Sequence, residues 1–96
     1  MKLDDPRLKK LRFRAWHRGF VEADLILGPY ADTHVGAMTA AQLDTFEALL
    51  EEGDHDLYSW IVGACEAPAD FQTDVLEQIR AFRFHATAAR RDGPGA

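Results

Sequence analysis

The residues best suited to chemistry in this sequence are few, and their spacing does not assemble a catalytic group. The histidines at positions 17, 34, 55 and 85 are never three or four residues apart, so no helical pair could chelate zinc. The single cysteine, Cys65, precedes Glu66, a carboxylate that disfavours a reactive thiolate. The single serine, Ser59, lies in an expected helix without a nucleophile-elbow pattern. The sequence therefore predicts a protein that is not an enzyme and holds no metal.

The stretch RGFVEAD, residues 18–24, places opposite charges on either side of a glycine. Arg18 could make a forked contact with a carboxylate, and Gly19 would let another backbone approach closely. A simpler explanation is local, because Glu22 lies four residues after Arg18 and would favour the first turn of a helix. Spacing alone favours this local ion pair over an interface.

Charge is strongly segregated along the chain. Residues 1–21 hold seven Lys/Arg and two Asp, residues 22–77 hold thirteen Asp/Glu and no Lys/Arg, and residues 78–96 hold four Arg and one Asp. The basic start could pair with the acidic middle of the same chain, or it could bind nucleic acid through its arginines and the interleaved Phe13 and Trp16. On helical spacing, Phe13, Trp16 and Phe20 could instead pack inward.

Helix signals dominate the pattern that must position these residues. Asp5 and Pro6 suit the start of a first helix that Gly19 interrupts or ends. A second helix is expected over about 20–30, with Val21, Leu25 and Gly28 on one stripe, weakened at its end by Pro29.

Three further helices follow. Thr39 and Gln42 predict a capping box for the third, with Gly53 as the residue just past its end. Asp54 or Asp56 would cap a short fourth helix that Gly63 ends. Pro68-Ala69-Asp70 would open the fifth, whose apolar stripe is Phe71, Val75, Ile79, Phe82 and Ala86.

These elements predict an all-α fold, a small five-helix bundle in a single domain. We expect the domain to span residues 1–89 and a polar, disordered tail to span 90–96. The longest strongly apolar run is Leu25-Ile26-Leu27, far short of a membrane span, and the start MKLDDPRLKK has no apolar core of a signal peptide. A cytoplasmic protein is expected.

The sequence resembles the family of succinate dehydrogenase assembly factors, also called FAD assembly or flavinylation factors. RGFVEAD supplies the family's R-G-x-x-E-x-D motif. The resemblance covers about residues 10–85 and continues through LILGPYAD, LDTFEALLEEGDHDLYSWIVG and the following Pro-Ala-Asp. RGxxE alone is a weak signal, whereas the combined motifs are specific. Phe20 and Val21 stand where the family is often polar or variable, which would tune the partner surface.

The resemblance implies a protein that binds the flavoprotein subunit of succinate dehydrogenase, and often that of fumarate reductase, and promotes covalent attachment of FAD to it. It implies Arg18, Gly19 and Glu22 as the core of the contact, with Asp24 and Arg14 as further candidates. The chain would bind no cofactor stably, because the partner would hold the FAD. It would be a monomer by itself, would bind neither nucleic acid nor membrane, and would work in the bacterial cytoplasm.

Overall fold

The computed structural model describes the backbone of residues 5–91 and the side chains of residues 5–83. Within these bounds the regular structure is helical and contains no strand, which confirms the expected all-α, five-helix fold. The five α-helices and two short 3₁₀ helices are α1 Pro6–Trp16, α2 Val21–His34, η2 Val35–Ala37, α3 Ala40–Leu50, α4 Asp54–Val62, η3 Ala69–Phe71 and α5 Asp74–Arg91. None of the described helices is both long and apolar enough to cross a membrane.

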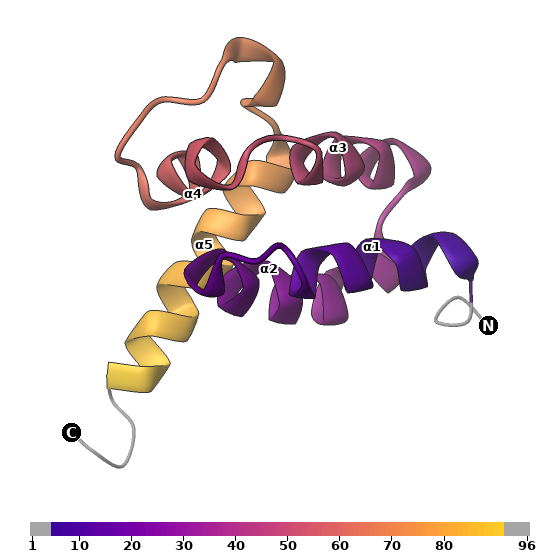
Figure 1. The fold of residues 1–96 in the computed structure, drawn as a ribbon, viewed down its shortest axis with the longest axis horizontal. Helices are drawn as coiled ribbons and strands as arrows, with labels where there is room; N and C mark the ends of the chain where they lie inside the picture. The colour runs from indigo at the N-terminus through magenta and orange to yellow at the C-terminus, as the bar shows by residue number, and fades with distance from the viewer. Residues whose placement is uncertain (1–4, 92–96) are drawn as a thin grey trace.

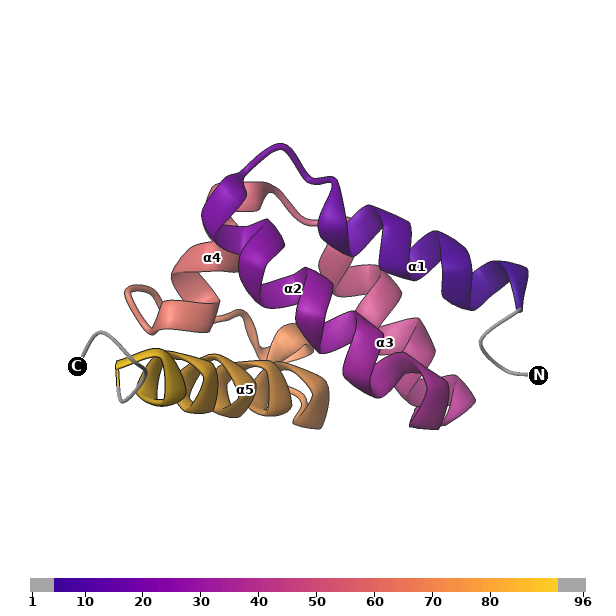
Figure 2. The same ribbon diagram turned by 90° about the horizontal axis from the view of Figure 1, so that it is seen from below.

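The helices pack in two layers crossed by α5. α1 and α2 run antiparallel as one layer, while α3 and α4 follow each other along the second (Figure 1). Turning the molecule by 90° brings α1 and α2 in front of α3 (Figure 2). α5 contacts α2, α3 and α4 and so ties the two layers together.

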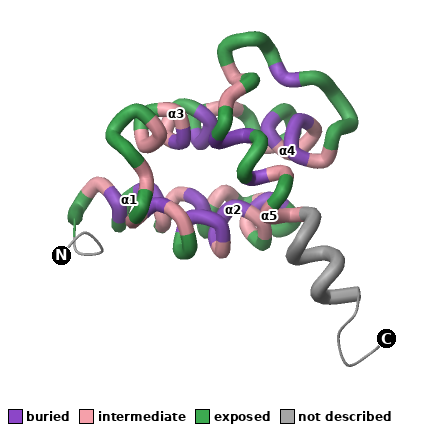
Figure 3. The backbone as a smooth tube through the Cα atoms, turned by 180° about the vertical axis from the view of Figure 1, so that it is seen from behind, coloured by how far each residue is buried: buried purple, intermediate pink, exposed green. Residues whose placement is uncertain are grey.

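One apolar core lies between these layers, and the backbone coloured by burial shows its buried positions on the helix faces that meet (Figure 3). Burying such side chains is the main force that holds short helices together, since several of them would be marginal alone. The largest fully buried side chains are Tyr30, Phe46, Leu11, Leu27, Leu49, Leu57, Leu76, Ile79, Val35 and Val75.

Three of the predicted boundary signals are confirmed. The Asp5 carboxylate accepts from the Arg7 N–H at 2.8 Å, with Pro6 as the first helical residue of α1. The Gln42 N–H donates to Thr39 Oγ1 and the Thr39 N–H donates to Gln42 Oε1, a complete capping box. Gly63 ends α4 with φ at +82°.

The second helix differs from its expected span and face. It continues through Pro29 to His34, because Tyr30, Ala31 and Val35 are buried and their packing outweighs the proline. The expected stripe is wrong as a buried face, since Val21 and Leu25 are exposed. The buried face of α2 is formed by Ala23, Leu27, Gly28, Tyr30 and Ala31.

Three boundary predictions are wrong. Gly53 does not terminate α3; its φ of −61° and ψ of 147° are extended backbone, and it is the N-cap of α4. Neither Asp54 nor Asp56 is the expected cap, because both lie within the first turn of α4. The fifth helix begins at Asp74 rather than Pro68, because Phe71 turns aside in η3 to stack on Trp60 at 5.3 Å. Helix α5 reaches Arg91, and the rest of the expected tail, 92–96, lies outside the described residues.

Candidate functional site

The RGFVEAD stretch forms the loop between α1 and α2 and the first turn of α2. Gly19 lies at the exposed centre of this loop with φ at +85°, a conformation that residues with a Cβ rarely adopt. A Cβ built on Gly19 would meet no atom within 4 Å. The backbone conformation therefore requires the glycine, and the space above it is open to a partner.

Arg18 points into the molecule. Its side chain is only 7% exposed, and its Nε donates to Asp54 Oδ1 at 2.7 Å. The two remaining guanidinium nitrogens donate to the Leu50 and Glu52 carbonyls, each at 2.6 Å. The local Arg18–Glu22 ion pair suggested by spacing is therefore wrong, because the guanidinium is occupied by acceptors at the joint between α3 and α4.

Asp24 and Phe20 hold the loop on its other side. Asp24 Oδ1 accepts from the backbone N–H of Arg18 at 2.9 Å. Phe20 packs against the rings of His55 and Tyr58, each with ring centroids 5.1 Å away. The chain is thus fixed immediately before and after Gly19.

Glu22 is exposed in the first turn of α2, where a carboxylate is favourable to the helix dipole. No ion pair or hydrogen bond joins the Glu22 carboxylate to another side chain among residues 5–83. The motif therefore presents one open glycine and one accessible negative charge on the same loop.

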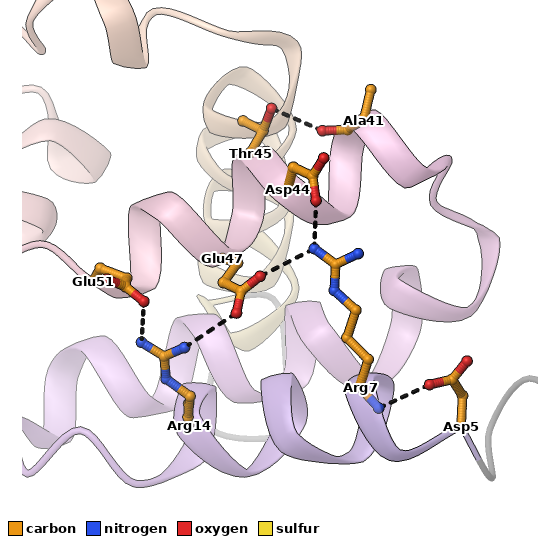
Figure 4. Close-up of polar contacts among 8 residues, drawn as sticks. All are labelled: Asp5, Arg7, Arg14, Ala41, Asp44, Thr45, Glu47 and Glu51. Carbon is orange, nitrogen blue, oxygen red and sulfur yellow. Dashed lines mark hydrogen bonds and ion pairs between the residues drawn. The ribbon is translucent and has the colours of Figure 1, made fainter.

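The basic residues of α1 pair with the acidic middle of the same chain, which confirms one of the two explanations for the charge segregation. Arg7 donates to Asp44 at 2.6 Å and to Glu47 at 3.0 Å, and the hydrogen bond with Asp44 raises the pKa of Arg7. Arg14 lies between Glu47 and Glu51 at 3.9 and 3.6 Å (Figure 4). Exposed pairs of this kind contribute little to stability each, but they align α1 with α3.

The large exposed apolar residues were not expected at this place. Among the described side chains they are Phe13 at 63%, Trp16 at 36%, Val21 at 65% and Leu25 at 52% exposed, and all four flank the loop. The prediction that Phe13 packs inward is wrong, because Leu8, Leu11 and Ala15 already form the buried face of α1. Phe20 packs as predicted.

Trp16 is partly covered through an unusual contact with α2. Its indole lies on Gly28, where an added Cβ would be closer than 3.0 Å to three ring carbons. The indole N–H also donates to Asp32 Oδ2 at 3.1 Å, and Arg12 donates to the other oxygen of the same carboxylate. Gly28 thus allows α1 and α2 to approach; the sequence signal was a glycine inside a helix, a position that often marks close packing.

The described site is an anchored, exposed loop between α1 and α2. In the described part of the chain, no three His, Cys, Asp or Glu side chains gather where they could hold a metal. Cys65 is exposed in the connection after α4 and lies in a different part of the fold from Gly19. The most distinctive structural features of this site are therefore the anchored loop and the exposed apolar residues that border it.

Comparison with known proteins places the whole arrangement in context. The family model described as "Flavinator of succinate dehydrogenase" matches residues 9–83. The "Succinate dehydrogenase assembly factor 2, mitochondrial" of Dictyostelium discoideum is 36% identical over 72 residues, covering 75% of this chain and 51% of that protein. The "FAD assembly factor SdhE" of Acetobacter pasteurianus is 34% identical over 73 residues, covering 76% of this chain and 67% of that protein. The chain thus matches about half the length of the first relative.

Proposed function

This chain belongs to the family described as the flavinator of succinate dehydrogenase, and we propose that it is an assembly factor for that enzyme's flavoprotein subunit. In this proposal it binds the flavoprotein and promotes covalent attachment of FAD. The observation that carries the proposal is the match over residues 9–83, because the matched region contains the anchored loop with its open Gly19 and accessible Glu22.

Gly19 and Glu22 are the residues we assign to direct contact. The open space above Gly19 lets a partner backbone approach, and the Glu22 carboxylate offers an acceptor to a basic or N–H group. Arg14 is a second point of contact. Its pairs with Glu47 and Glu51 are long and partly exposed, so a flavoprotein carboxylate can replace either acid at small loss.

In this proposal the chain binds the flavoprotein and does not itself form the covalent bond to FAD. By binding the attachment-competent conformation of the flavoprotein more tightly than other conformations, it raises the population of that state. The flavoprotein holds the FAD and the residue that becomes linked to it. A binding role of this kind needs only the contacts proposed above, which are Gly19, Glu22, Arg14 and the exposed apolar border.

The test is co-expression with the flavoprotein, followed by affinity capture and measurement of covalent flavin by its fluorescence in a denaturing gel. We expect wild type and the control Glu66→Ala, an exposed acid far along the chain, to capture the flavoprotein equally. Glu22→Ala and Gly19→Arg should lose capture and covalent flavin. Undiminished covalent flavin with folded Gly19→Arg would show that the loop is not the contact.

The nucleic-acid alternative is not retained. The family match gives it no support, and Arg7, Arg12, Arg14 and Arg18 each pair with a carboxylate of the same chain. A phosphate backbone would have to displace these acids. The flavoprotein of fumarate reductase as a second partner, the monomeric state and the cytoplasmic location stay predictions.

A further inference from the structure

We propose that Arg18 and Asp54 are positioning residues, which hold the α1–α2 loop in the shape that the partner recognises without themselves touching the partner. The inference rests on the proposed function for the identity of the partner. It removes the arginine of the RGxxE motif from the contact surface and makes the joint between α3 and α4 part of the functional site.

The first support is that every nitrogen of the guanidinium already donates a hydrogen bond inside the molecule. All three of its nitrogens donate, to Asp54 Oδ1 and to the carbonyls of Leu50 and Glu52, at 2.6–2.7 Å. With 7% of its side chain exposed, Arg18 could reach a partner only by breaking these bonds. The planar fork of arginine satisfies acceptors in several directions at once, which a lysine ammonium on a flexible stem does not reproduce.

The second support is that one of the Arg18 acceptors, the Leu50 carbonyl, lies at a helix end that needs a donor. Leu50 is the last residue of α3, and the last carbonyls of a helix have no partner within it. The last turn of α3 contains no basic residue that could serve. Arg18 therefore provides the cap and the positive charge that the C-terminal end of α3 favours, while Asp54 opens α4.

The third support is that the three hydrogen bonds of the Arg18 guanidinium, which we call the Arg18 clamp, act together with other contacts to fix the loop. Arg18 is fixed by its side chain, its backbone N–H is fixed by Asp24, and Phe20 is packed against α4. Only Gly19 between them is free of neighbours. A loop held in its binding shape avoids the entropic loss of being ordered by the partner, so releasing it should weaken binding.

The test compares Asp54→Ala with Asp56→Ala, a control that removes an exposed acid from the same first turn of α4. We expect Asp54→Ala to bind the purified flavoprotein roughly tenfold more weakly than the control, because an unanchored loop must be ordered on binding. If Arg18 itself contacted the flavoprotein, Asp54→Ala would free the guanidinium and affinity would be kept or increased. Affinity equal to that of Asp56→Ala would therefore overturn the inference.

Two further measurements separate positioning from general loss of fold and from failure of the proposed function. Asp54→Asn keeps one acceptor oxygen, so it should fold and give an intermediate affinity. Amide hydrogen exchange of residues 18–20 in the free protein needs no partner, and we expect it to be faster in Asp54→Ala and Arg18→Lys than in Asp56→Ala. Unchanged exchange in both variants would overturn the clamp even if the flavoprotein still bound.

Discussion

Because the Trp16 indole packs on Gly28, it decides whether Gly28→Ala raises or lowers the stability of the protein. A glycine inside a helix is normally improved by alanine, by about 1 kcal/mol. At Gly28 the new Cβ would come closer than 3.0 Å to three carbons of the Trp16 ring, so the indole has to leave its place. We therefore expect Gly28→Ala to destabilise the protein, although it improves the local helix.

The magnitude follows from how much of Trp16 is covered. Trp16 is 36% exposed, so roughly 150 Å² of a tryptophan surface is removed from water. At about 25 cal/mol per Å², complete loss of this contact would cost roughly 4 kcal/mol as an upper estimate. A partly exposed ring can tilt outward and keep about half of its contacts, which leaves a loss of roughly 2 kcal/mol. After the helix gain of about 1 kcal/mol, the expected net destabilisation is about 1 kcal/mol.

Thermal unfolding followed by circular dichroism measures this difference. For a domain of this size, about 1 kcal/mol corresponds to a fall in Tm of about 4–8 °C. The decisive control is the same change in a Trp16→Ala background, where the indole is gone and Gly28→Ala should become stabilising. A rise in Tm on Gly28→Ala in the wild-type background would refute the reasoning, since it would mean that the indole moves without loss.

Three further predictions concern single groups, each measured by unfolding. Gly63→Ala should cost about 1–2 kcal/mol because φ is +82°, whereas the matched control Gly63→Asn should cost less, because Asn adopts this left-handed conformation more readily; equal effects would contradict the backbone argument. Thr39→Ala removes the capping box and should cost about 1 kcal/mol, against a much smaller effect of Thr45→Ala later in α3. Burial raises the pKa of the Tyr30 phenol, so the folded state favours the neutral phenol more than the unfolded state does. The stability that this residue contributes is fully present below the ordinary phenol pKa of about 10 and is lost as the pH rises above that value. The free energy of unfolding, measured with denaturant at increasing alkaline pH, should therefore fall more steeply in wild type than in Tyr30→Phe. Parallel pH dependences in the two proteins would contradict this explanation.

The features that could be predicted from the sequence are those fixed by neighbours a few residues apart. The Asp5 cap, the Thr39–Gln42 box and the Gly63 terminus each depend on bonds or dihedral angles within one helical turn. Such signals place a helix end without knowledge of the rest of the fold. The all-α class follows because these local signals agree along the chain.

The features that could not be predicted depend on residues far apart in the sequence. Spacing offered Glu22 as the partner of Arg18, whereas the true acceptors lie 32–36 residues away at the α3–α4 joint. The same contact explains why Gly53 was misassigned, since α3 is capped by Arg18 and needs no left-handed glycine. For the candidate site, the motif located the loop, but only the packing shows which of its side chains face outward.

The separation between Arg18 and its acceptors also sets the order in which the molecule can be completed. A chain leaves the ribosome from its N-terminus at about 5–20 residues per second, and closing a contact over more than thirty residues is slower and less favourable than forming a local turn. Residues 17–20 are synthesised early, yet their final shape depends on Leu50, Glu52 and Asp54. The loop therefore reaches its anchored shape only after α3 has ended and α4 has begun, so an unfinished chain would present the motif without that shape.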